Sequence, residues 1–479
     1  MRLPLWPLLL SAMVAGGSVL VGAPSVVASP FTAWWTVGAG YVSVSPGGEV
    51  MLVPLGSFGE NGTAVARTVD AAQLWTTTQQ FLGFDNAGAR TLWGGERLVG
   101  SGDWALRDAR TGAQLLGGTV DPPVSSLWPC AGYVQGWFSP DDALLFIGYV
   151  DSATSAARTL AYRIADGALL YNASLAGVYA PSLNICNNYG GAAFVPAASD
   201  PRGAGLMVTV WVSEPGDNTP ATIAQDVTTG APVWLSSVLP HAVSPPVWAQ
   251  GMLLLPWTPC AFGEGGGVHI LSALNGSRIG GISYCKECSG EFDGPSSDLF
   301  VVQGFSDGQY IPTSLQFLNV SRGFVGAFVA NARPIAGDDD HVCPHDDGGC
   351  TDSIFGWAFS AGAGVVVVAQ AGPVKSVHDP DVAAWYSGYK VVNGSTASWE
   401  VQFPGPGYGS FAVVDTAAGQ VVVAMHGSYT LMMDASNGHV LWNGTTPVAG
   451  ATRLSLCPWP ACVLVQCGDS STTLLDVAL

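Results

Sequence analysis

Short apolar runs recur along the chain, separated by stretches rich in glycine, proline and polar residues. The clearest runs are Val50–Leu55, Leu144–Val150, Gly205–Val212, Met252–Pro256, Leu299–Gly304, Val365–Gln370 and Val421–Met425. Each is five to eight residues long, which is typical of a strand and too short for most helices. The pattern predicts a protein made of many short strands joined by turns.

A turn of fixed spacing repeats between these runs. Three copies, Asp108–Leu116, Asp226–Trp234 and Asp434–Trp442, place Asp four residues before Gly and a large apolar residue four residues after it. The Asp side chain can accept a backbone N–H within the turn, and Gly supplies a positive φ. Looser copies surround Asp70–Trp75, Gly167, Gly276, Asn319–Gly323 and Gly394. The copies predict a repeated strand–turn–strand unit.

Units of this length, each with several short strands, predict the blades of a β-propeller. The segment 472–479 resembles the strand entering the turn, and Phe31–Val37 resembles the strand leaving it. Pairing of these N- and C-terminal strands would complete one blade and close the ring. Eight copies of the turn and this split one are present, and we expect at least one weak copy to be false. We therefore predict an all-β fold, a single propeller of eight blades, with seven as the alternative.

A turn of this form that ends in tryptophan resembles the repeat of PQQ-like (quinoprotein alcohol dehydrogenase-like) β-propellers. The resemblance covers nearly all of residues 29–479 and is most specific at residues 226–234 and 434–442. In that family the tryptophan docks on the neighbouring blade. The resemblance therefore implies a blade-docking role for Trp75, Trp234, Trp399 and Trp442. It does not settle activity, because such repeats occur in enzymes and in propellers that bind no cofactor.

Composition restricts the possible partners. The chain of 479 residues has 35 Asp and Glu against 16 Lys and Arg, a net charge of −19, which argues against nucleic acid and anionic membrane surfaces. A hydrophobic share of 48% is ample for a packed core and excludes general disorder.

The N-terminal segment predicts export. Arg2 is its only charge, and the apolar residues behind it end in Val26-Val27-Ala28, which fits the small-x-small rule for signal peptidase. We expect residues 1–28 to be a signal peptide and residues 29–479 a single propeller domain, secreted or in the lumen of the secretory pathway. The alternative is an uncleaved membrane anchor, although its prolines and glycines make it a poor helix. No stable membrane span is expected once the signal is removed.

The ten cysteines all follow residue 28, and an even number in an exported chain predicts disulfides. The close pairs that could clip single loops are Cys285 with Cys288, Cys343 with Cys350, and Cys457 with Cys462. For the first pair zinc or redox chemistry is the alternative. Six Asn-x-Ser/Thr sequons are candidate glycosylation sites, at Asn61, Asn172, Asn275, Asn319, Asn393 and Asn443.

One acidic segment, residues 337–351, offers candidate metal ligands. These are Asp338, Asp340, His341, His345 and Asp347. Calcium would use the carboxylates and a transition metal would prefer the histidines. The spacing matches no standard calcium loop, so the alternative is a solvated insertion between blades.

No catalytic or cofactor-binding residue can be selected from the sequence. Quinoprotein alcohol dehydrogenases place a disulfide between adjacent cysteines over the quinone, and this chain has no Cys-Cys pair and no haem attachment motif. We expect an exported, non-catalytic propeller that binds a protein or glycan through loops at its rim. The alternatives are an oxidoreductase that uses PQQ with Ca²⁺ or another metal, and a sugar-processing hydrolase or lyase with paired carboxylates.

Overall fold

The computed structural model describes most of the chain after residue 28. The described residues are 29–38, 42–55, 62–94, 102–120, 134–151, 154, 156–175, 180–181, 192–212, 220–236, 246–249, 251–257, 267–283, 299–304, 314–319, 327–331, 353–360, 364–372, 383–390, 397–406, 410–427, 429–445, 448, 450–457, 460–467 and 471–477. The predicted signal peptide, residues 1–28, lies outside them.

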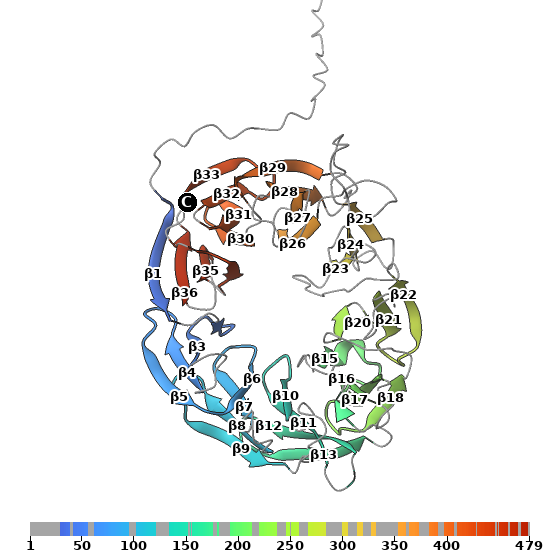
Figure 1. Cartoon of the computed structure of the whole chain (residues 1–479). Helices are drawn as coiled ribbons and strands as arrows, with labels where there is room; N and C mark the ends of the chain where they lie inside the picture. The colour runs from blue at the N-terminus through green and yellow to red at the C-terminus, as the bar shows by residue number, and fades with distance from the viewer. Residues whose placement is uncertain are drawn as a thin grey trace, which may run out of the picture.

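In the described residues, nine antiparallel sheets follow one another around a ring (Figure 1). We call them blades 1 to 9 in chain order. Blades 1 to 3 are β2–β5 (Ser43–Val44, Val50–Pro54, Thr63–Arg67, Gln73–Thr77), β6–β9 (Gln80–Phe84, Arg90–Gly94, Asp103–Asp108, Gln114–Thr119) and β10–β13 (Gln135–Phe138, Leu144–Val150, Ala157–Arg163, Leu169–Leu175). Blades 4 to 6 are β14–β18 (Ala180–Pro181, Ala192–Val195, Leu206–Val212, Pro220–Asp226, Pro232–Ser236), β19–β22 (Val247–Ala249, Met252–Trp257, Gly267–Ser272, Arg278–Ser283) and β23–β25 (Leu299–Gly304, Ser314–Asn319, Ala327–Asn331).

Blades 7 and 8 are β26–β29 (Ser353–Ser360, Val365–Gly372, Ala383–Lys390, Ala397–Pro406) and β30–β33 (Ser410–Thr416, Gly419–His426, Tyr429–Asp434, Val440–Thr445). Blade 9 combines β34–β36 (Arg453–Leu456, Cys462–Cys467, Ser471–Val477) with β1 (Phe31–Val37) from the other end of the chain. A short 3₁₀ turn, η2 (Ala197–Ser199), lies within blade 4. Among the described residues no helix is long and apolar enough to cross a bilayer.

The all-β propeller fold is as predicted, and the number of sheets is one more than the expected eight. Eight blades have at least four strands, and blade 6 has three in the described residues. The extra sheet arises at the weakest copy of the turn, after Asn319, where β24 and β25 nevertheless pair from Ser314↔Asn331 to Leu318↔Ala327. The sequence around this turn has lost the bulky residue after Gly, whereas its strands have kept their apolar pattern.

The ring closes by pairing of the two terminal strands, as the sequence predicts. β1 pairs antiparallel with β36 from Phe31↔Val477 to Val37↔Thr472. Within each blade the first strand lies towards the axis of the ring and the last strand lies on the outside (Figure 1). First strands of successive blades contact one another, as β6 does with β10 and β30 does with β34.

The hydrophobic core is divided among the junctions between blades. One cluster packs Val421 and Val423 of blade 8 against Val463 and Val465 of blade 9, and similar clusters fill six other junctions, all those that do not involve blade 6. A middle strand is therefore covered on both faces, which explains its unbroken apolar sequence. In β27 the run from Val365 to Ala369 is at most 1% exposed. All seven apolar runs of the sequence form the second strand of a blade or, at Leu299–Gly304, the first described strand.

Candidate functional site

In blades 2, 4 and 8 the repeated turn joins the last two strands of the sheet, and its Asp side chain holds it closed. Asp108 Oδ1 accepts the backbone N–H of Thr111 at 2.7 Å and that of Arg110 at 3.1 Å. Gly112 has φ +71°. Burial alone would raise the pKa of Asp108, but these hydrogen bonds prevail and hold the pKa below its ordinary value. Asp226 and Asp434 accept equivalent bonds, so these carboxylates are structural.

Three of the four tryptophans that the resemblance marks for docking reach the turn of the following blade. Their indole N–H groups donate to the carbonyl just after the third strand: Trp75 to Ala109 (3.0 Å), Trp234 to Ala273 (3.1 Å) and Trp399 to Ala435 (3.2 Å). Each indole also lies on the glycine of that turn, where a Cβ on Gly112, Gly276 or Gly438 would come within 2.4–2.7 Å of the ring. These glycines are therefore required by the close approach as well as by their positive φ.

The fourth tryptophan, Trp442, docks on the split blade. Here no turn joins β36 to β1, and the ring of Phe31 takes its place, edge-on to Trp442 at 5.6 Å between centroids. The junction is therefore formed by the first described strand of the chain.

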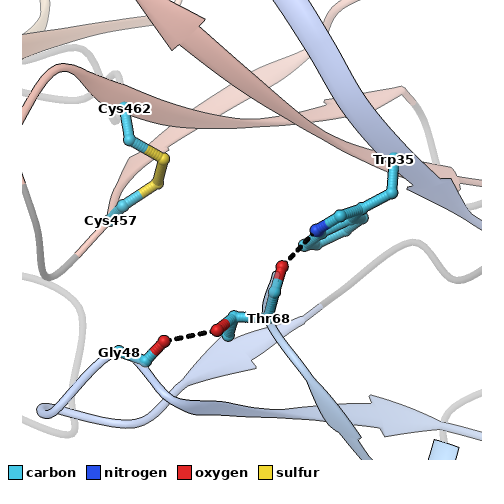
Figure 2. The surroundings of a disulfide bond; sticks show 5 residues. All are labelled: Trp35, Gly48, Thr68, Cys457 and Cys462. Carbon is cyan, nitrogen blue, oxygen red and sulfur yellow. Dashed lines mark hydrogen bonds between the residues drawn. A yellow bond between two sulfur atoms is a disulfide. The ribbon is translucent and has the colours of Figure 1, made fainter. Parts of the chain in front are cut away.

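Trp35 has the same docking role, and sequence reasoning missed it. Its indole N–H donates to the carbonyl of Thr68 in the turn of blade 1, and the Thr68 hydroxyl donates to the carbonyl of Gly48 (Figure 2). The signal was hidden because the split blade separates Trp35 from the glycine that precedes the docking residue in other copies. The Trp34-Trp35 pair in the strand leaving the turn was the available clue.

The disulfide between Cys457 and Cys462 lies at this same junction (Figure 2). It clips the turn between β34 and β35, with 5.5 Å between the Cα atoms. Cys462 is buried in a cluster with Trp35, Met51 and Leu474, so the bridge packs beside the ring closure. The other candidate pairs, Cys285 with Cys288 and Cys343 with Cys350, lie outside the described residues.

A second inter-blade contact, between the first turns of blades 2 and 3, is polar. The Asp142 carboxylate accepts the backbone N–H groups of Asn86 and Ala87, each at 2.9 Å, and the Asn86 side-chain amide at 2.7 Å. Asn86 also donates to the Ser139 carbonyl at 2.9 Å. Asp142 has φ +55°, a conformation in which Asp is tolerated better than most residues. We call this set of bonds the Asp142 clasp.

The candidate metal ligands Asp338, Asp340, His341, His345 and Asp347 lie outside the described residues. Within the described part of the chain, no group of three or more His, Cys, Asp or Glu side chains is placed to hold a metal ion. Of the candidate glycosylation sites, Asn61 and Asn393 also lie outside it.

A site for PQQ with Ca²⁺ at the axis would be lined by the first strands of the blades. In their described residues they carry one cation, Arg453, and one carboxylate, Asp415. Asp415 Oδ1 already accepts the Gln420 amide at 2.7 Å. Three quinone carboxylates and a calcium ion require more cations and more oxygen ligands than this set provides. The described strands therefore do not fit this cofactor.

The two faces of the ring differ in how they are built. Because the strands are antiparallel, the first and third turns of each blade lie at one end of its sheet, which we call the turn face. The second connection and the link to the next blade leave from the other end, the loop face. Connections on the turn face are mostly short and hydrogen-bonded, as at Asp85–Arg90 and Asp226–Ala231.

The loop face carries the long connections. Residues 120–134 and 332–352 link successive blades there, and residues 284–298 leave blade 5 from the same face. These segments contain Cys130, Cys285, Cys288, Cys343, Cys350 and the acidic segment 337–351. These long, non-repeating segments all follow strands that end at the loop face, so they leave their blades from one side of the ring.

Nine sheets in ring order in the described residues, with tryptophans docked on the turn of the next blade, make this chain a β-propeller. No protein-family model matches the sequence. No curated protein matches it either.

Several solved structures resemble the fold. BamB from Moraxella catarrhalis is 13% identical, over 93% of this chain and 99% of that chain, with a TM-score of 0.40. The Dos1 propeller is 10% identical, over 94% and 95%, with a TM-score of 0.47. A quinohemoprotein alcohol dehydrogenase from Comamonas testosteroni is 13% identical, over 94% and 77%, with a TM-score of 0.42. Similarity at this level carries no argument about activity.

Proposed function

We propose that this chain is an exported, non-catalytic propeller that binds a protein or glycan partner through its loop face. The observation that carries the proposal is the contrast between the two faces. The turn face consists of compact turns whose carboxylates are engaged in their own backbone, as Asp108, Asp226 and Asp434 are. The loop face carries the long connections, and loops on a rigid scaffold are where binding residues concentrate.

Export is supported by the apolar segment before residue 28 and by the Cys457–Cys462 disulfide, which suits an oxidising compartment. A non-catalytic role is supported by the first strands, whose described residues offer only Arg453 and Asp415 as charged groups. Catalysis at the axis would need several convergent polar groups.

The first experiment is an absorption spectrum and metal analysis of the purified secreted protein, before and after addition of PQQ and Ca²⁺. A colourless protein that takes up neither is the expected result. A stoichiometric quinone signal would overturn the proposal in favour of an oxidoreductase.

The second experiment locates the binding surface with an array of defined oligosaccharides and with cross-linking on the cell surface. Residues 332–352 are replaced by a short Gly-Ser linker, and the control variant changes the exposed turn-face residues Asp70 and Asp166 to Asn. We expect the linker variant to lose binding at least tenfold and the control to retain it. Equal loss in both variants would rule out the loop face.

A further inference from the structure

Two asparagines occupy the same register position on the outer strands of two blades. Asn172 pairs with Leu160 of the third strand and directly follows Tyr171. Asn443 pairs with Leu431 and directly follows Trp442. Both strands, β13 and β33, are the last in their sheets, so the position lies on the outer wall of the ring (Figure 1).

The fold itself does not explain asparagine at this position. Asparagine is depleted in strands, and neither side chain hydrogen-bonds to any described residue. Asparagines in the turns are different, because their side chains hold the backbone. Asn275 Oδ1 accepts the Ser277 N–H at 3.0 Å, and Asn437 Oδ1 accepts the His439 N–H at 2.8 Å.

Both outer-strand asparagines begin a sequon. Asn172-Ala-Ser174 and Asn443-Gly-Thr445 fit the acceptor motif. Asn172, Ser174 and Thr445 are exposed and Asn443 is half-buried, so a bulky group on either asparagine would extend into solvent. Tyr171 and Trp442 point into the junctions instead, since Tyr171 contacts Gly230 and Trp442 contacts Phe31.

We propose that Asn172 and Asn443 carry N-linked glycans on the outer wall of blades 3 and 8. The side-chain amide nitrogen bonds to the anomeric carbon of an oligosaccharide held on a lipid diphosphate. The lipid diphosphate leaves, and the amide gives up one proton. The glycans cover the unpaired edges of β13 and β33, which would otherwise be free to pair with another strand.

This inference rests on the export proposed above and sharpens the proposed binding mode. Carbohydrate on the outer wall obstructs a partner that approaches from the side of the ring. The loop face carries neither of these two sites, so these two glycans leave it open.

The test is peptide mapping of the full chain secreted from a eukaryotic host, before and after treatment with an amidase that removes N-glycans. The treatment converts a glycosylated Asn to Asp. We expect conversion at Asn172 and Asn443. Two variants remove each sequon differently, Asn172→Gln or Ser174→Ala, and Asn443→Gln or Thr445→Ala. Each is expected to lose one glycan from the intact mass. Asn437→Gln is the matched control, because Asn437 lies outside any sequon, and it should leave the glycan mass unchanged.

The state of Cys457 and Cys462 separates the two ways in which the inference can fail. If this disulfide is formed and both asparagines remain unmodified, the glycan proposal is wrong and export stands. Reduced cysteines together with no glycan on any sequon would overturn export and glycosylation together.

Discussion

The junction between blades 7 and 8 and the junction between blades 2 and 3 join neighbouring blades in different ways. At the first, Trp399 is 8% exposed, lies on Gly438 and donates to the Ala435 carbonyl. At the second, the docking position is Leu116, and a Cβ added at Gly167 would meet only one of its methyl groups, at 3.1 Å. The second junction adds the Asp142 clasp on the turn face.

The comparison shows that the repeat determines where neighbouring blades pack together. It does not determine which side chains and hydrogen bonds join them. A large indole supplies both apolar area and one hydrogen bond at the same point. Where leucine replaces it, the hydrogen bond disappears and the clasp supplies polar contacts elsewhere. The two junctions should therefore respond differently to mutation and to pH.

The largest effect is expected from Trp399→Ala. Loss of a buried indole in a core position costs about 3–5 kcal/mol in the free energy of unfolding. Leu116→Ala should cost about 1–2 kcal/mol, because Leu116 is only partly buried and makes no hydrogen bond. Urea denaturation followed by tryptophan fluorescence measures both. Leu115→Ala is the control, since Leu115 is 52% exposed, and equal losses for Trp399 and Leu116 would refute the comparison.

The next effect concerns the closing junction, which resembles the Trp399 junction without having a turn. Phe31→Ala removes the partner of Trp442 and should cost about 3 kcal/mol, since Phe31 is 7% exposed. Hydrogen exchange should show faster opening of β1 and β36 than of β31. Uniform opening of all blades would mean that the junction is not a local weak point.

A smaller effect is expected at the Asp142 clasp. Asp142→Gly keeps the positive φ and removes the carboxylate, so it should cost about 1.5 kcal/mol, the low end of the range for hydrogen bonds to a charged group, because these bonds are exposed. Asp142→Asn retains one acceptor oxygen and tolerates the same backbone conformation, so its loss should be smaller. Thermal melts of both variants test this order, and the reverse order would show that backbone strain dominates.

The smallest expected effect is a pH dependence of the free energy of unfolding that involves only the junction with the Asp142 clasp. Burial raises the pKa of Asp85, the nearby Asp142 charge adds to this, and hydrogen bonds from Arg90 oppose it. Because the folded pKa is raised, ionised Asp85 costs stability at neutral pH. This cost begins to shrink as pH falls below the folded pKa and is gone once pH is below the lower, unfolded pKa. The stability difference between wild type and Asp85→Asn should therefore move in favour of wild type from pH 7 to pH 4. The difference for Trp399→Ala should stay constant, and a parallel change would contradict the assignment.

Much of the fold follows from the sequence because a propeller is periodic. Runs such as Val365–Gln370 are buried on both faces, and the Asp-to-Gly turn fixes its own geometry, so both are visible locally. Trp35 was missed because no turn precedes it: the two strands that the turn would join, β36 and β1, come from opposite ends of the chain. The Asp142 clasp was missed because Asn86 and Asp142 are 56 residues apart and neither belongs to the repeated spacing. The candidate metal ligands, which depend on one non-repeating segment, stay a prediction.

Closure of the ring by β1 has a consequence for synthesis. Thr36 and Thr473 meet across that pairing with a sequence separation of 437 residues, so β1 leaves the ribosome long before its partner exists. Its apolar residues, which include Phe31 and Trp35, cannot pack against β36 until the other eight blades have been synthesised. Such a distant contact makes completion of the ring slow and leaves the early chain open to aggregation.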